Sequence, residues 1–210
     1  MLTVMSEQAE TRNERKERTR QALMDGTLAL AADRGFAALS LREIARSAGI
    51  VPTAFYRHFG SLDDLGATLV DESVTALRLA LREVRRKPDA RLSDSVRFVF
   101  DQVEPKRELF GFLTRERHGG SAALRHAIAL ELQLIVRELV ADLSRLRALD
   151  AWAPTELETA ADLIVATVAD GIAAYISAVP RERTAVIDRT VAQVRIIALG
   201  MAAWWPAKDR

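Results

Sequence analysis

Apolar residues recur at helical spacing along this chain. Leu41, Ile44, Ala45 and Ala48 fall at positions i, i+3, i+4 and i+7, which places them on one face of a helix. No run alternates strictly between apolar and polar residues, as a half-buried strand would. The glycines and prolines fall mainly between the apolar runs. The pattern predicts an all-α fold of about nine helices.

The breaks between the apolar runs set the expected helix boundaries. Ser40 and Glu43 have the spacing of a capping box at the start of a helix, and so do Ser61 and Asp64. Residues 87–89, which include a proline, stop the fourth helix. The expected helices cover residues 14–33, 40–48, 52–59, 62–86, 91–103, 105–117, 121–149, 154–178 and 183–202.

Residues 40–59 have the form of two short helices joined by a tight turn. Gly49 supplies the turn, and Pro52 suits the first turn of the second helix, where its missing N–H costs nothing. Phe55 and Phe59 lie four residues apart and form the buried side of that helix. The arrangement is typical of a helix-turn-helix, whose second helix enters the major groove of DNA.

The opposite side of the second helix has residues that suit DNA. The Thr53 hydroxyl and methyl groups suit base edges, Arg57 suits guanine or phosphate, and Tyr56 suits phosphate oxygens. Residues 11–20 hold five basic and two acidic residues, and this basic arm is either a phosphate contact or a solvated tail. The predicted DNA-contacting residues are Lys16, Arg18, Arg20, Ser40, Arg42, Thr53, Ala54, Tyr56, Arg57 and His58.

The composition argues against several other kinds of site. The chain has no cysteine, which excludes disulfides, thiolate metal sites and a cysteine nucleophile. It has three histidines and lacks the common hydrolase, zinc-protease and phosphate-loop motifs, so we expect no enzyme, no metal and no cofactor. Residues 1–20 are polar, and Asp170 interrupts the most apolar stretch, residues 163–179. These features predict a cytoplasmic protein that spans no membrane.

The motif SLREIARSAGIVPTAFYRHF occupies residues 40–59, and Asp-Asp-Leu follows at residues 63–65. With these motifs, residues 19–59 resemble the DNA-binding domain of the tetracycline-repressor (TetR) family. The resemblance implies a transcriptional repressor that binds double-stranded operator DNA as a homodimer and responds to a small apolar effector. Val51 and Leu62 depart from the family, where a capping residue and a lysine are frequent, and each removes an expected phosphate contact.

Three further stretches resemble one subgroup of that family. Residues 113–128, Val-Asp-Glu-Ser at residues 70–73 and the pair Trp204-Trp205 are similar to the FabR/DesT-type repressors of unsaturated fatty-acid synthesis. The resemblance implies that a long-chain acyl-CoA is the effector. We therefore expect a DNA-binding domain over residues 1–61 and a ligand-binding and dimerisation domain over residues 62–210.

Apolar residues of the C-terminal domain are candidates to line a ligand cavity, although an ordinary core has the same pattern. Basic residues surround Gly119-Gly120 and suit either the phosphates of coenzyme A or salt bridges to Glu108 and Glu116. Asp170 is costly to bury unless it is paired, and it belongs either at a subunit interface or in the ligand cavity. The predicted ligand-binding residues are Val99, Val103, Phe110, Leu113, Arg115, Arg117, His118, Arg125, Ile128 and Asp170.

Two apolar stripes predict the subunit interface. Small and apolar residues recur at steps of three and four along residues 157–175 and 187–201. Two such helices, paired with copies from a second subunit, form a four-helix bundle, and packing within one subunit is the alternative. The predicted interface residues are Ile164, Val168, Tyr175, Val191, Val194, Ile197, Ala198 and Met201.

A second function is compatible with the same fold. A multidrug-sensing regulator would have a promiscuous pocket, and cationic drugs favour aromatic faces. Aromatic residues make up 6% of this chain, which disfavours such a pocket.

Overall fold

The computed structural model describes residues 11–85 and 92–203. All regular structure within these ranges is helical, which confirms the predicted fold class. The expected helix break at residues 87–89 and the pair Trp204-Trp205 lie outside the described residues. The α-helices of the described ranges are α1 (Arg12–Arg34), α2 (Leu41–Ser47), α3 (Pro52–Phe55), α4 (Leu62–Arg85), α5 (Leu92–Val103), α6 (Arg107–Gly119), α7 (Ala122–Leu143), α8 (Pro154–Ser177) and α9 (Arg183–Ala203).

Two helices are shorter than the sequence pattern predicted, because their backbones change to tighter turns. Beyond α3, the N–H groups of Arg57 and His58 bond to carbonyls three residues back, so the α-helix ends at Phe55 rather than near residue 59. Beyond α7, the chain turns in the same way at Leu146 and continues as a short 3₁₀ helix. The single helix expected over residues 121–149 therefore ends at Leu143.

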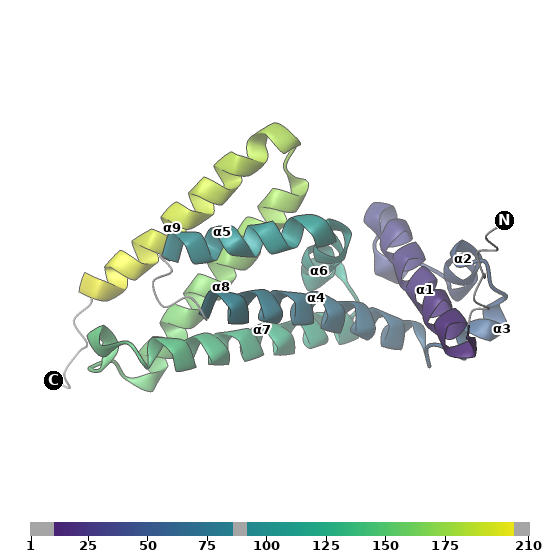
Figure 1. Cartoon of the computed structure of the whole chain (residues 1–210), viewed down its shortest axis with the longest axis horizontal. Coiled ribbons are helices and arrows are strands. Elements are labelled where there is room, and N and C mark those ends of the chain that lie inside the picture. Colours follow the sequence, from purple (N-terminus) through teal and green to yellow (C-terminus); the bar gives the residue numbers. More distant parts are fainter. Residues whose placement is uncertain (1–10, 86–91, 204–210) are drawn as a thin grey trace, which may run out of the picture.

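The helices form a small unit at one end of the molecule and a larger bundle at the other (Figure 1). Helices α1–α3 make up the small unit, and α4 leads from it into the bundle, where it packs against α5, α6 and α7. Helix α8 packs between α7 and α9. Helix α6 contacts α1 as well as α4, α7 and α8, and so joins the small unit to the bundle.

The small unit is closely packed around aromatic side chains. Phe55 and Phe59 are fully buried, as the sequence predicted, and their ring centroids lie 5.8 Å apart. Helices α1 and α2 approach so closely at Gly26 that an added Cβ atom would lie 2.1 Å from the Ser47 hydroxyl oxygen. Gly49 has a φ of 68° in the turn before α3, a conformation that glycine adopts without strain.

The apolar stripes of α8 and α9 face the interior of the same chain. Val194 is 0% exposed, and the buried Tyr175 donates a hydrogen bond to Glu104 over 2.8 Å. Gly171 brings the two helices together, because an added Cβ atom there would lie 2.4 Å from the Thr190 hydroxyl oxygen. The expectation that Tyr175 and Val194 contact a partner subunit is therefore wrong. The alternative, packing within one subunit, accounts for both residues.

The remaining residues of the predicted interface differ in how far they are buried. Ile164 and Val168 of α8 line an internal cavity, and the half-buried Val191 packs against the core. Ile197, Ala198 and Met201 of α9 are half-buried. The large apolar side chains that α8 and α9 expose are instead Leu163, Ile196 and Leu199.

Candidate functional site

The outer side of α3 presents polar side chains to solvent. Thr53 and Arg57 are exposed, and Tyr56 is 63% exposed. The Tyr56 ring stands edge-on to the buried Phe55 ring at a centroid distance of 5.7 Å, so the core fixes the base of the exposed side chain. Ala54 is half-buried beside them. The face that sequence analysis assigned to base edges and phosphates is therefore the accessible face of this element.

A capping box fixes the start of α2. The Ser40 hydroxyl accepts from the Glu43 N–H over 3.3 Å and donates to the Glu43 carboxylate over 2.8 Å. Hydrogen bonds from the Ser40 side chain and backbone, with a further bond from Arg34, lower the pKa of Glu43 to about 2. The hydroxyl of Ser40 thus holds the helix end that positions the exposed Arg42.

Arg20 of α1 contacts both the turn that follows α3 and the first turns of α4. Its guanidinium lies 4.2 Å from the centroid of the Phe59 ring, donates to the His58 carbonyl over 2.8 Å and reaches Thr68 over 3.5 Å. This side chain is engaged within the protein, and its contact with phosphate stays a prediction. Lys16 and Arg18 remain exposed on the same helix.

His58 is half-buried in the turn that follows α3. Within the described structure, its Nδ1 atom has no hydrogen-bond partner. Burial lowers the pKa of His58, and the positive charges of Lys16, Arg20 and Arg57 lower it further. The imidazole is therefore held in its neutral form at neutral pH.

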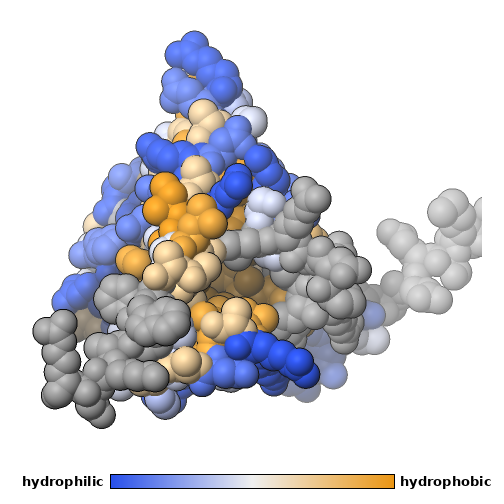
Figure 2. All heavy atoms as spheres, turned by 90° about the vertical axis from the view of Figure 1, so that its left-hand side faces the viewer, coloured by the Kyte–Doolittle hydropathy of each residue, from blue (hydrophilic) through white to orange (hydrophobic). Residues whose placement is uncertain are grey.

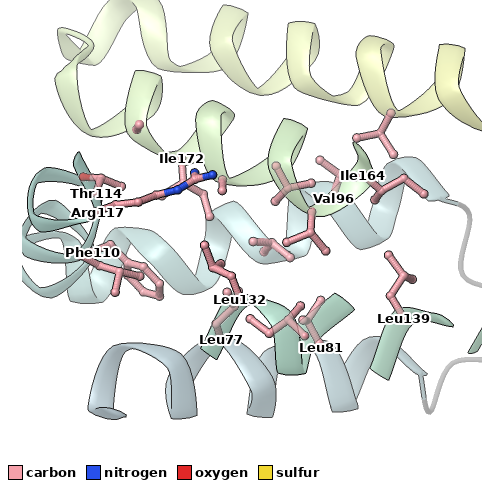
Figure 3. Close-up of a pocket in the computed structure, with 18 of the residues that line it drawn as sticks. Leu77, Leu81, Val96, Phe110, Thr114, Arg117, Leu132, Leu139, Ile164 and Ile172 are labelled. Carbon is pink, nitrogen blue, oxygen red and sulfur yellow. The ribbon is translucent and has the colours of Figure 1, made fainter. Parts of the chain in front are cut away.

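The helices of the bundle line a cavity of about 240 Å³ that is partly open to solvent (Figure 3). Apolar side chains also gather around a hollow at the end of the molecule opposite α1–α3 (Figure 2). The side chains around the cavity come from α4 to α9 and are mostly aliphatic. They are Leu77, Leu81, Ser95, Val96, Val99, Phe110, Leu113, Thr114, Arg117, His118, Ile128, Leu132, Ile135, Leu139, Asp142, Ile164, Val165, Val168, Ala169, Ile172, Ala173 and Val194.

Six of the predicted ligand-binding residues line this cavity and four lie elsewhere. The six are Val99, Phe110, Leu113, Arg117, His118 and Ile128. Val103 is fully buried in the core, outside the cavity lining. Arg115 donates to the Ala31 carbonyl over 3.0 Å, and Arg125 donates to the Gly120 carbonyl. Asp170 is neither buried nor in the cavity: its side chain is 74% exposed and pairs with Arg117.

Sequence analysis missed the leucines and isoleucines that line most of the cavity. Leu77 and Leu81 are four residues apart on α4, and Leu132, Ile135 and Leu139 follow helical spacing on α7. Spacing alone places such residues on a buried face, but it cannot distinguish the wall of a cavity from a filled core. The cavity wall also takes in Ile164, Val168 and Val194, which the stripes had assigned to the subunit interface.

The last turn of α6 ties the bundle to α1. Glu116 is 2% exposed and accepts a hydrogen bond from the Phe36 N–H over 3.0 Å, just beyond the end of α1. Arg115 reaches the Ala31 carbonyl in the last turns of α1. The other side of α6 presents Leu113 and Arg117 to the cavity. One short helix therefore contacts both the cavity and the small unit.

Helix α8 has an unusual amount of exposed apolar surface. By length and composition it is the one helix in the described ranges that is able to cross a membrane. It packs against α6, α7 and α9 and lines the cavity, yet only 28% of its most apolar 18-residue stretch is buried in this chain. Exposed apolar surface of this kind marks a site of contact with another molecule.

Two family models cover most of the chain. Residues 23–67 match the model of bacterial regulatory proteins of the tetR family. Residues 88–199 match the C-terminal domain of tetracyclin repressor-like proteins. The chain therefore belongs to the TetR family of bacterial transcriptional regulators, which bind DNA through a helix-turn-helix.

Solved structures share this fold at low sequence identity. A putative TetR-family regulator from Syntrophomonas wolfei is 15% identical with a TM-score of 0.73, over 93% of this chain and all of that one. A regulator from Rhodococcus is 24% identical with a TM-score of 0.66, over 88% and 96% of the two chains. The FadR regulator of Bacillus subtilis, solved with stearoyl-CoA, is 13% identical with a TM-score of 0.67, over 86% and 98%.

Proposed function

We propose that this chain is a cytoplasmic repressor that binds operator DNA as a homodimer and whose affinity for DNA is tuned by a long-chain acyl-CoA. The observation that supports the proposal most directly is the apolar cavity in the bundle. Helix α6 connects this cavity to the small unit of α1–α3, which the proposal makes the DNA-reading unit. Thr53 and Arg57 read bases, Tyr56 and Arg42 contact phosphates, and Lys16 and Arg18 add charge beside them.

The proposed dimer uses the outer faces of α8 and α9. Gly171 faces Thr190 across this helix pair, and the helices run antiparallel. Moving eight residues back along α8 and eight residues forward along α9 places Leu163 level with residue 198, beside Leu199. With the exposed Ile196, these side chains form an apolar surface that a second copy would bury.

The shape of the cavity favours a chain-like ligand. Ile128 and Asp142 both line it and lie on the same helix, so at about 1.5 Å per residue they are roughly 20 Å apart along α7. A volume of about 240 Å³ spread over that length is narrow. An acyl chain fits this shape, with the coenzyme A portion outside.

Two further facts bear on the choice of effector. The fold neighbour from Bacillus subtilis was solved with stearoyl-CoA, which supports acyl-CoA binding by a bundle of this kind. Phe110 is the one aromatic residue among the described side chains around the cavity. A multidrug sensor, the alternative, would favour more aromatic surface for cationic drugs. The sequence resemblance to FabR/DesT-type repressors also supports a long-chain acyl-CoA as the effector.

The effector would act by shifting the spacing of the two DNA-reading units. Recognition helices of a dimer must lie about 34–36 Å apart to enter successive major grooves. An acyl chain beside Leu113 of α6 and Leu77 of α4 presses on the two helices that meet the small unit. Only a difference in affinity between the two arrangements shifts their equilibrium, and about 1–3 kcal/mol of coupling gives a 5–150-fold change in DNA affinity.

Operator binding in the presence of acyl-CoA tests the proposal. An operator duplex is first selected with the purified protein from a random DNA library. Its affinity is then measured by fluorescence anisotropy with oleoyl-CoA, with palmitoyl-CoA and without ligand. We expect at least one thioester to change the affinity by fivefold or more. If neither changes it and calorimetry detects no thioester binding, acyl-CoA is not the effector, and the multidrug sensor becomes the preferred function.

A further inference from the structure

We propose that Val51 makes this protein select thymine, because its aliphatic side chain packs against the 5-methyl group of a thymine base in the major groove. The inference rests on the proposed function, since it assumes that α3 enters the major groove of an operator. It goes further by adding a specificity-determining residue to the predicted DNA contacts and by naming the base that this residue favours.

Val51 lies at the leading end of α3. It is the N-cap residue of this helix, directly before Pro52, and its backbone carbonyl accepts from the Ala54 N–H over 2.9 Å. In helix-turn-helix proteins the N-terminal residues of the recognition helix contact base edges. Thr53, a proposed base contact, follows two residues later. Val51 therefore belongs to the end of α3 that approaches the bases.

The three helices of the small unit begin in different ways. The side chains of Thr11 and Ser40 accept hydrogen bonds from the first turns of α1 and α2. Val51 makes no side-chain hydrogen bond at the start of α3. A hydroxyl group at an N-cap stabilises the helix that follows, and valine gives up this contribution. The stability of α3 therefore does not account for a valine at this position.

The Val51 side chain is exposed as well as apolar. In the described part of the small unit, the large apolar side chains that are exposed are Val51, at 64%, and Tyr56, at 63%. Tyr56 has a hydroxyl group for a polar partner, and its ring packs edge-on against Phe55. The side chain of Val51 has carbon atoms alone, so it gains from a partner only by burying apolar surface.

Thymine presents an apolar group that suits such a side chain. Base pairs are distinguished in the major groove by hydrogen-bond donors and acceptors and by the 5-methyl group of thymine. A valine that covers a donor or acceptor removes its water and returns no hydrogen bond, which is unfavourable. A valine that covers the methyl group buries apolar surface on both molecules. The exposed Pro52 and Thr53 beside it continue the same surface of the protein.

Deoxyuridine scanning of the operator tests the inference, because deoxyuridine lacks only the 5-methyl group of thymidine and keeps its base pair. The full-length protein and its selected operator duplex are used without effector at one salt concentration, since salt alone changes DNA affinity. Each thymine is replaced in turn, in both half-sites together, and affinity is measured by fluorescence anisotropy. We expect one such replacement to lower the affinity by about tenfold or more, from about fourfold for each methyl group buried.

Variants at Val51 assign this loss to its side chain. Val51→Ser supplies a capping hydroxyl and removes the apolar contact, so helical content should be kept and the loss at that thymine should fall below about twofold. Val51→Ile keeps an aliphatic side chain and should keep the loss. Leu146, which is 51% exposed beyond α7, provides the matched control, and Leu146→Ser should keep the wild-type loss.

The possible failures separate the inference from the proposed function. Operator binding without any loss on deoxyuridine replacement, or a loss that survives Val51→Ser, would overturn the inference and leave α3 as the DNA-reading helix. A loss that survives Val51→Ser but disappears in Thr53→Ser would assign the methyl contact to Thr53 and overturn it as well. A protein that selects no operator from the library would contradict the proposed function itself.

Discussion

The unit of α1–α3 and the bundle of α4–α9 differ in how completely their side chains fill space. In the small unit, Phe55 and Phe59 are fully buried, and Gly26 lets α1 and α2 touch. In the bundle, the helices stand apart around a cavity of about 240 Å³. A filled core resists deformation and moves as one body, whereas a hollow one can rearrange around a ligand. The difference agrees with the proposed function, in which the small unit reads DNA and the bundle senses the ligand.

The junction between the two regions combines hydrogen bonds with apolar contacts. Glu116 and Arg115 of α6 bond to backbone groups at the end of α1, and Gly66 of α4 packs there against Phe36 and Leu124. Directional hydrogen bonds tie the orientation of one body to the other more tightly than apolar contact alone. On the proposed function, changes in the bundle would reach the reading unit through this contact as well as through the continuous chain of α4.

The largest expected effect comes from placing a charge on the inner rather than the outer face of α9. Val194→Asp places an unpaired charge at a position with 0% exposure and should lower the free energy of unfolding by more than about 3 kcal/mol. Ile196→Asp, at 69% exposure, should leave helical content intact and reduce the mass in solution from two chains to one. Circular dichroism and light scattering measure the two outcomes. A Val194→Asp variant that is folded but monomeric would return Val194 to the subunit interface.

The next effect concerns the reading unit alone. Thr53→Ala with Arg57→Ala removes two base contacts worth about 1–3 kcal/mol each, so operator affinity should fall by at least tenfold. Tyr56→Phe should weaken binding to all sequences by a similar factor, as loss of a phosphate contact does. The exposed Arg145, at the end of α7, gives the control Arg145→Ala. Wild-type operator affinity in the double variant would mean that α3 does not read DNA.

A smaller effect should appear at the junction. Glu116→Ala leaves the Phe36 N–H without its acceptor and should cost about 1–3 kcal/mol of stability. It should also reduce the change in operator affinity that the effector causes, since α6 then loses one of its two hydrogen bonds to this end of the small unit. Glu108→Ala, on an exposed position of the same helix, should alter neither quantity. Full effector response in a destabilised Glu116→Ala variant would show that α4 transmits the signal without α6.

The two regions also differ in how far the sequence could predict them. The exposed side of α3 and the turn at Gly49 were predicted correctly, because helical spacing places the aromatic residues there on one side and the polar residues on the other. On α8 and α9 apolar residues cover most of the circumference, so periodicity could not decide which stripe faces inward. The stripe through Val194 was therefore placed on the wrong side, and the arginines near Gly119 were expected to bind ligand when two of them bond to backbone carbonyls.

The smallest effect is a pH dependence that belongs to the reading unit. Burial and the charges of Lys16, Arg20 and Arg57 lower the pKa of His58 in the folded protein, while the unfolded chain titrates near 6.5. As the pH falls below about 6.5 the unfolded chain binds a proton first, so this contribution to stability is present above that pH and is lost on acidification. Denaturant unfolding at several pH values between neutrality and mild acid should show a shallower loss in His58→Gln than in the wild type. His126→Gln, at an exposed position on α7, should keep the wild-type slope. Equal slopes in all three proteins would place the acid sensitivity outside the reading unit.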